Sequence, residues 1–240
     1  MNRFVKVTVA ALAVAASVSV FAADEKEIFK SNHDEVIGWT PVCVGLATPV
    51  QLPFGMNKWD VYGLDLGLLF VDVPELYGVN LAGLAAMNRN EIRGVQFAGI
   101  ANFSQDKVYG IRAAFGFNIA QDDVYGVEIG GFGLRKNFCG LGVEFLGSFQ
   151  RTLTGCALSG LVSINMDEVT GAVVAIGGNV TEIATGCMVA GCYNHAEELH
   201  GCQIGLVNYC NDCQEGFQIG LVNIIMSNQV PFLPFVNGCF

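Results

Sequence analysis

Residues 201–225 read GCQIGLVNYCNDCQEGFQIGLVNII and contain the pattern Gly-x-Gln-Ile-Gly-Leu-Val-Asn twice, fifteen residues apart. A glycine that follows a turn and precedes an apolar or small residue recurs with similar spacing over most of the chain. These glycines are Gly63, Gly78, Gly94, Gly110, Gly126, Gly140, Gly155, Gly171, Gly186, Gly201 and Gly216. Because the spacing stays at 14 to 16 residues, residues 201–225 are two copies of one repeating unit.

The repeating unit has the character of a β-structure. In the copy GVQFAGIANFSQDKVY, residues 94–109, apolar residues lie two apart within each short segment. That spacing is typical of a strand with one face turned inward. The glycines and asparagines between the segments suit corners, because both residue types tolerate positive φ. A helix is disfavoured, since each interior glycine costs about 1 kcal/mol. The repeat therefore predicts an all-β chain.

A glycine-rich β-solenoid with repeats of 15–16 residues is the expected architecture. Some copies have an extra alanine before the middle glycine, which a corner accommodates but which would reverse the facing of a strand. Like residues also recur at matched places, as parallel stacking favours. The expected ladder of asparagines is Asn102, Asn118, Asn179, Asn194, Asn208 and Asn223. The turns show no alternation of short and long, which outer-membrane barrels have.

An antiparallel outer-membrane β-barrel of about eleven or twelve strands is the alternative, and as a function it would be an integral membrane protein or pore. Residues 110–120, GIRAAFGFNIA, alternate over about the length of one barrel strand. The chain also ends in Phe240, after a segment similar to an outer-membrane terminal strand.

The first 22 residues have the features of a secretory signal peptide. Arg3 and Lys6 precede the apolar run VTVAALAVAASVSVF, and Val20-Phe21-Ala22 fits the small-residue rule for cleavage. We therefore expect a signal peptide over 1–22, an N-terminal cap segment over 23–60, a repeat domain of eleven coils over 61–225 and a C-terminal cap over 226–240. The expected location is the cell envelope, the outer membrane or the cell surface, with the periplasm as a further option.

Charge and composition limit the partners. The chain has 22 acidic and 12 basic residues, a net charge of −10. It lacks a basic stripe for a phosphate backbone, so we expect no nucleic-acid partner. Because 52% of its residues are hydrophobic and only 14% are charged, its surface must be partly apolar. We expect flat faces with columns of Val, Ala, Phe and Gln that bind an envelope or host partner, with outer-membrane association as one option.

The chain has nine cysteines, so at least one lacks an intramolecular disulfide partner. Three of them, Cys156, Cys187 and Cys202, directly follow repeat glycines, and we expect them to point inward as small buried hydrophobes. Cys210 and Cys213 form the sequence CNDC in a turn. We expect a disulfide or a pair of loop thiols there, in preference to a redox motif or half of a zinc site.

Other polar residues resemble functional sites without matching a known spacing. His195 and His200 flank two glutamates near Cys192, but HAEELH is not HExxH, so we expect solvated turn residues. The acids of the turns should align along one edge, which we interpret as a solubilising edge in preference to a cation-binding rim. They are Glu91, Asp106, Asp122, Asp123, Asp167, Glu168, Glu182, Glu197, Glu198 and Asp212. We expect no catalytic residues, cofactor or metal, and no enzyme activity.

Several segments together resemble a family of bacterial surface-repeat proteins. They are TPVQLPF (48–54), VYGLDLGLLF (61–70), the Gly-x-Gln-x-Gly-x-x-Asn repeats and LPFVNGCF (233–240). The resemblance covers residues 48–240 and implies an envelope or surface protein of a bacterium with an outer membrane. It implies no enzyme activity. The copies between 126 and 186 lack the glutamine and several carry cysteine, which departs from the family pattern.

Overall fold

The computed structural model describes residues 36, 38–47, 50–52 and 58–239 of the chain. The expected signal peptide and residues 23–35 lie outside the described residues. Over the part that is described, no helix has the length and apolar character needed to cross a membrane.

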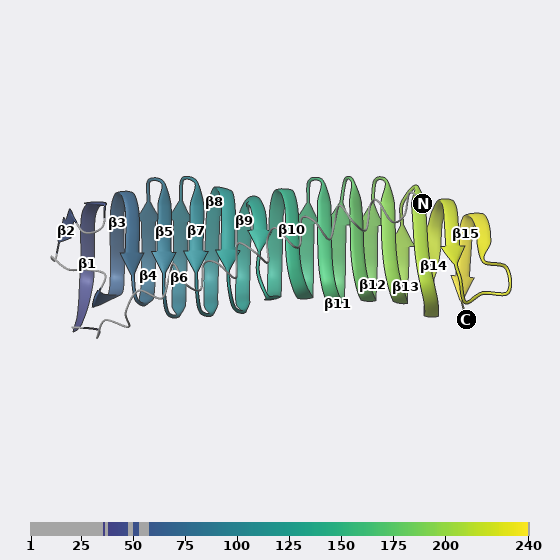
Figure 1. Cartoon of the computed structure of the whole chain (residues 1–240), viewed down its shortest axis with the longest axis horizontal. Helices are drawn as coiled ribbons and strands as arrows, with labels where there is room; N and C mark the ends of the chain where they lie inside the picture. The colour runs from purple at the N-terminus through teal and green to yellow at the C-terminus, as the bar shows by residue number, and fades with distance from the viewer. Residues whose placement is uncertain (1–35, 37, 48–49, 53–57, 240) are drawn as a thin grey trace, which may run out of the picture. The chain divides into compact units, whose positions relative to one another are not determined.

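The described residues form one sheet of fifteen strands that winds into a stack of coils (Figure 1). The strands are β1 (Gly38–Ala47), β2 (Val50–Leu52), β3 (Trp59–Val73), β4 (Leu76–Ala82), β5 (Ala85–Asn88), β6 (Ile92–Ala98), β7 (Ala101–Ser104), β8 (Val108–Ala120), β9 (Val124–Leu134), β10 (Asn137–Ser159), β11 (Val162–Ala175), β12 (Gly178–Ala190), β13 (Tyr193–Ile204), β14 (Val207–Ile225) and β15 (Phe232–Cys239).

Each coil has two extended segments and two turns. In one coil, β6 is the segment that contains the repeat glycine, and β7 is the segment at the level of the asparagine ladder. We call these the glycine segment and the asparagine segment. The first turn joins them within a coil, here at Gly99 and Ile100, and the second turn, here at 105–107, leads to the next coil. Longer strands such as β8 contain both segments of a coil.

Neighbouring coils pair in parallel and in register. Gly94 is opposite Gly78 and Gly110, and Asn102 is opposite Asn118. The prediction of a repeat β-solenoid is therefore confirmed. The alternative of an antiparallel barrel is wrong because successive coils run in the same direction.

All eleven repeat glycines have positive φ, between 127° and 156°. A side chain at these sites would also have no room. A Cβ at Gly171, for example, would overlap the carbonyl oxygen of Gly155 in the preceding coil. Only glycine satisfies both the backbone conformation and this close approach, which explains why the residue recurs in every coil.

The asparagine ladder lies inside the coils. Asn194 donates hydrogen bonds to Asn208 Oδ1 at 2.9 Å and to the backbone oxygen of Ile204 at 2.9 Å, and its own Oδ1 accepts one from Asn179 at 2.9 Å. Asn208 continues the ladder to Asn223 at 2.8 Å.

Asn102 and Asn118 form a separate run of the ladder, in which Asn102 donates to Asn118 Oδ1 at 2.9 Å. Between the two runs of asparagine, Gly133, Ser148 and Ser163 occupy the same column. Because the amides are buried, each hydrogen bond replaces one that water would otherwise make. Where asparagines stand in consecutive coils, the ladder thus joins one coil to the next through side chains as well as backbone.

The second residue after each repeat glycine also points inward, and in seven of the eleven coils it is polar or charged. Gln203, Gln218 and Gln96 are fully buried. Gln218 donates to Gln203 Oε1 at 2.8 Å. The expected surface columns of glutamine are therefore wrong. The amides bond to one another along the stack, and the flanking apolar residues point outward in their place.

Antiparallel strands lie at both ends of the stack. β2 pairs with β1, and β15 pairs with β14. β1 itself continues the parallel stack next to β3. β1, β2 and β15 fall within the segments expected as caps, 23–60 and 226–240. Pro234 lies in β15, where it removes one backbone donor from the sheet edge. Their role as caps stays a prediction.

Replacement of Gly171 by alanine should lower the free energy of unfolding by about 3 kcal/mol. The reason is the positive φ of 130° together with the overlap with Gly155. Urea unfolding followed by circular dichroism measures the change. The control is Thr170→Ala, one residue away and exposed, which should alter stability by less than about 1 kcal/mol. Equal effects of the two substitutions would contradict the role given to the glycine.

Candidate functional site

The surface formed by the glycine segments is apolar from end to end. The residues one and three places after each repeat glycine point outward, and in all eleven coils they are apolar or cysteine. Phe97 and Ile219, for example, are 43% and 42% exposed. We call this surface the glycine face. A contiguous apolar surface of this kind is typical of a binding site.

The surface formed by the asparagine segments is apolar as well. The residues on either side of the asparagine column point outward, and they include Phe117 and Phe132, whose rings stack with centroids 5.6 Å apart. Among the described residues of these two columns, the charged or titratable side chains are those of Asp72, Tyr193, His195 and Tyr209. We call this surface the asparagine face.

The first turns join the two faces into a third apolar side. Phe115 is 85% exposed, Ile176 72%, Leu68 67% and Leu221 58%. No described first turn contains a charged residue. We call this side the apolar edge. Exposure of large apolar side chains to water is unfavourable, so burial of this side against a partner would lower the free energy.

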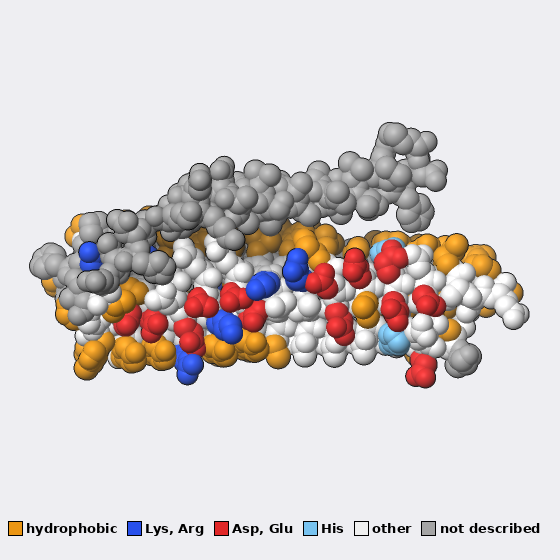
Figure 2. Space-filling view, turned by 60° about the horizontal axis from the view of Figure 1, so that its bottom comes forward, with side chains coloured by type: hydrophobic (Ala, Val, Ile, Leu, Met, Phe, Trp, Pro, Cys, Tyr) orange, Lys and Arg blue, Asp and Glu red, His pale blue; other side chains and the backbone are white. Residues whose placement is uncertain are grey.

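The second turns form the opposite side, where the acidic residues collect. Glu168, Ile183, Glu198 and Asp212 stand in register in successive coils. Figure 2 shows the red acidic side chains as a row along this side, with blue basic side chains among them and with orange apolar surface above the row and, in its left half, below it. We call it the acidic edge.

The acids affect one another along this edge. Burial, followed by the nearby charges of Asp60, Glu91 and Asp106, raises the pKa of Glu75 above its usual value. Still, nowhere in the described ranges do three or more His, Cys, Asp or Glu side chains form a group that could hold a metal ion. The solubilising role of this edge stays a prediction.

A column of tyrosines separates the glycine face from the acidic edge in the first half of the stack. Tyr62 and Tyr77 stack with centroids 4.7 Å apart, and Tyr109 and Tyr125 do so at 5.0 Å. Arg93 lies between the two pairs, with its guanidinium carbon 5.7 Å from the Tyr77 ring and 5.4 Å from the Tyr109 ring. Cation–π contacts therefore continue the aromatic stack through the coil between these two pairs, in which arginine takes the place of tyrosine.

The strongest cluster of titratable groups lies inside the coils. Arg112 and Arg135 both bind the carboxylate of Glu128. Arg135 also pairs with Glu144 at 2.7 Å and donates to Gln150 Oε1 at 2.8 Å. We call these five residues the buried charge network.

The network has no access to solvent. The side chains of Arg112, Arg135, Glu128 and Glu144 are all at most 1% exposed. Burial raises the pKa of Glu144 to about 7, against the opposing effect of Arg135. Glycines at 133 and 142 provide the space, since a Cβ at either site would lie within 3 Å of Arg135 and Glu144 atoms. This network was not among the sites expected from the sequence, although its charged residues stand at inward-facing places of the repeat.

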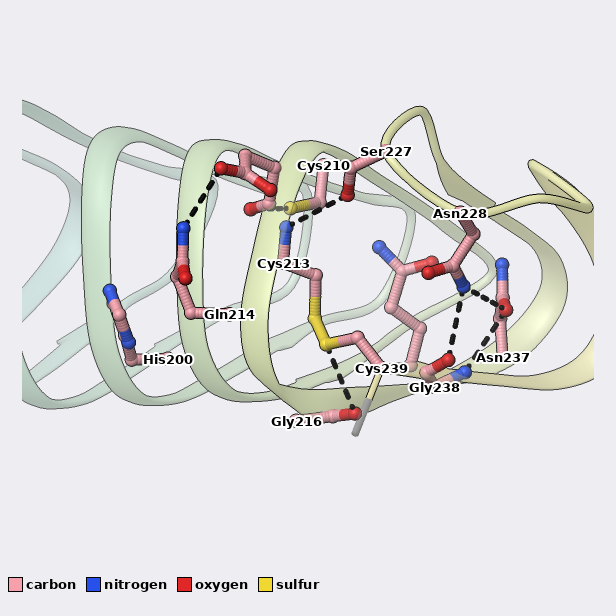
Figure 3. The surroundings of a disulfide bond; sticks show 12 residues. His200, Cys210, Cys213, Gln214, Gly216, Ser227, Asn228, Asn237, Gly238 and Cys239 are labelled. Carbon is pink, nitrogen blue, oxygen red and sulfur yellow. Dashed lines mark hydrogen bonds between the residues drawn. A yellow bond between two sulfur atoms is a disulfide. The ribbon is translucent and has the colours of Figure 1, made fainter.

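The cysteines of the CNDC turn do not bond to each other. Cys213 forms a disulfide with Cys239 of β15, with Cα atoms 6.0 Å apart (Figure 3). Cys210 is a buried thiol that donates to the backbone oxygen of Asp212 at 2.7 Å. The expected link between Cys210 and Cys213 is thus replaced by one to the C-terminal strand, because β15 folds back antiparallel onto β14.

Cys156, Cys187 and Cys202 lie on the glycine face, half-exposed, so the expectation that they point into the core is wrong. The residue after a repeat glycine faces outward in this fold. Cys187 and Cys202 are opposite each other in neighbouring coils, and the Cys202 thiol donates to Cys187 Sγ at 2.8 Å. Burial, followed by the contact with Cys187, raises the pKa of Cys202 to about 12.

The two histidines near Cys192 are not brought together. His195 neighbours the asparagine column and bonds Glu197 at 3.2 Å, whereas His200 precedes a repeat glycine and bonds Glu198 at 2.9 Å. They therefore lie on opposite faces of the coil. Cys192 belongs to a first turn at the apolar edge. This arrangement offers no shared ligand geometry.

Comparison with models of protein families, with curated proteins and with solved structures finds no match for this chain.

The buried network predicts how stability depends on pH. Since the pKa of Glu144 rises from 4.5 to about 7 on folding, the folded chain holds a proton between these pH values that the unfolded chain releases. Its contribution to the free energy of unfolding is therefore present below pH 4.5 and is lost as the pH rises toward 7. Glu144→Gln should show a smaller decrease over this range, measured by urea unfolding at several pH values. The exposed Glu182→Gln is the control, and parallel curves for Glu144→Gln and the parent would contradict the assignment.

Loss of the disulfide should loosen the C-terminal end of the stack. The bond closes a sequence separation of 26 residues, so Cys239→Ser should lower the free energy of unfolding by about 3 kcal/mol. Hydrogen exchange should become faster in β15 first, because among the described strands its one pairing partner is β14. Cys192→Ser, at an exposed thiol, serves as the control. Unchanged exchange in β15 after loss of the bond would contradict this role.

Proposed function

We propose that this chain is an exported repeat protein of a bacterial cell envelope, with a binding or structural role and no catalytic activity. The β-solenoid fold fits a structural or binding repeat protein. Export and a location in the cell envelope go beyond the fold, and we propose both. The family resemblance of residues 48–240 to bacterial surface-repeat proteins supports them.

The apolar outer surface is the observation that carries the binding role. The glycine face, the asparagine face and the apolar edge expose large hydrophobic side chains in every part of the stack. An ordinary soluble monomer rarely exposes contiguous apolar patches of more than a few hundred Å². A chain that maintains such a surface over all its coils is expected to use it for binding.

Two independent features support export. Residues 1–22 have the pattern of a signal peptide. The Cys213–Cys239 disulfide is of the kind that persists outside the reducing cytoplasm. Export would deliver the chain to the periplasm, the outer membrane or the cell surface.

The electrostatics support a partner that is neither a nucleic acid nor a small substrate. The acidic edge and the net charge of −10 repel a phosphate backbone. A substrate would have no route to Glu128 or Glu144, because the coils enclose both side chains. We propose that an envelope or host component binds the outer surface.

Expression of the full chain in a bacterium with an outer membrane tests the proposal. We expect the chain to lose about 22 residues, to appear in the envelope or periplasmic fraction, and to contain the Cys213–Cys239 bond by peptide mass spectrometry. A matched chain without residues 2–22 should stay in the cytoplasm with reduced thiols. An unprocessed cytoplasmic product from the full chain would contradict export.

A further inference from the structure

We propose that the solenoid inserts its apolar edge into one leaflet of a lipid bilayer, with the acidic edge in water. This inference rests on the proposed function and names the partner of its apolar surface as lipid.

The distribution of charge carries the inference. The charged side chains of the described residues fall into two groups. The first, such as Arg112 and Glu128, is enclosed in the core. The second lies at the second turns or in the columns that border them, as in the row of Figure 2. The glycine face beyond the tyrosine column and the whole apolar edge have no charge, which suits hydrocarbon on one side of the coil and water on the other.

The depth of the apolar surface matches one leaflet. From Ile111, the first outward residue of the glycine face, to Phe115 at the apolar edge, the strand advances four residues, about 13 Å at ~3.3 Å per residue. The hydrocarbon of one leaflet is about 15 Å thick, half of the ~30 Å of a bilayer. The coil is therefore deep enough to fill one leaflet and too shallow to span two.

The backbone of the coils is compatible with lipid. In hydrocarbon each backbone N–H and C=O needs a protein partner. The parallel pairing between coils supplies these partners along the stack, and the first turns continue it, as Gly99 N–H donates to the Ala82 oxygen at 3.1 Å and Ile100 N–H to the Leu84 oxygen at 2.7 Å. The edge that is proposed to lie deepest thus bonds its backbone from coil to coil.

The tyrosine column lies where the bilayer interface would be. Tyr62, Tyr77, Tyr109 and Tyr125 stand between the apolar glycine face and the acidic edge. Tyrosine is enriched at membrane interfaces, where its ring contacts hydrocarbon and its hydroxyl contacts water.

A lipid leaflet fits this surface better than a second copy of the chain does. Two copies that pack through their glycine faces would cover one side of each coil, and they would leave Phe117 on the asparagine face and Ile176 on the apolar edge in water. A fluid leaflet covers both faces and the edge together. Acidic residues that outnumber basic ones along the acidic edge favour zwitterionic over anionic lipid.

Two native thiols test the orientation. Cys192 is exposed at the apolar edge and Cys139 is exposed in the column of the tyrosines. The exported chain, purified in detergent and transferred to phosphatidylcholine vesicles, should float with them in a density gradient. A charged, membrane-impermeant maleimide should then label Cys139, while the labelling of Cys192 falls about tenfold relative to the urea-unfolded chain.

A matched pair of substitutions tests the energetics within one coil. Ile176 lies at the apolar edge and is 72% exposed, whereas Ile183 lies at the acidic edge between Glu168 and Glu198. Ile176→Glu should lower partition into phosphatidylcholine vesicles by about tenfold or more, because the charge must enter hydrocarbon. Ile183→Glu adds the same charge on the water side and should change partition by less than about twofold. Circular dichroism confirms that both variants are folded.

The outcomes separate this inference from the proposed function. Flotation with protected Cys192 and a selective effect of Ile176→Glu would support it. A chain that is exported but does not float, or whose Cys192 reacts as fast as Cys139 on vesicles, would overturn the insertion and leave export intact. Protection of Cys192 without lipid, in a dimer that detergent does not dissociate, would assign the surface to a second copy and overturn the inference as well.

Discussion

The close approach of the backbone at the repeat glycines is the constraint on which this fold depends. Each of these residues has positive φ and lies against a carbonyl oxygen one coil earlier, which belongs to Pro41 for Gly63 and to the preceding repeat glycine for the other ten. Neither a side chain nor a shift of a single residue is therefore tolerated. The glycines thereby fix the register of the whole stack. Once Gly94 is opposite Gly78, every other residue of the coil meets its counterpart, and like side chains form columns.

The columns place many polar residues inside the coils and many apolar residues on the outer surface, which is the reverse of the usual arrangement. Amides and charges occupy inward places, where the next coil supplies a partner at the same height, as Gln203 does for Gln218 and Asn208 for Asn194. A buried polar group costs free energy only if it lacks such a partner. Apolar residues such as Phe97 then occupy the alternate outward places. Stacking in register makes a partly polar core stable and leaves the hydrophobic surface on the outside.

The sequence predicts the repeat and the parallel stack, because glycine spacing and recurring asparagines directly reflect the register. It does not predict which side of each strand faces inward. An alternation with period two fits both facings equally well, and the usual rule that apolar residues lie inside selects the wrong one for Val95, Gln96 and Cys187. The sequence does not predict the Cys213–Cys239 bond either. The bond depends on β15 turning back onto β14, and no spacing within the repeat indicates that turn.

The buried charge network supplies a specificity that uniform columns lack. A slip of two residues along a strand keeps every side chain on its own face, so columns of amides or of valine and alanine discriminate weakly against it. Arg112, Glu128 and Arg135 are different, because each charge meets an opposite charge in only one alignment of neighbouring coils. Misalignment would leave a charge buried without a partner, at a cost of several kcal/mol. The network lies mid-stack, where the asparagine ladder is interrupted at Gly133, and it therefore enforces alignment in the coils in which that ladder does not.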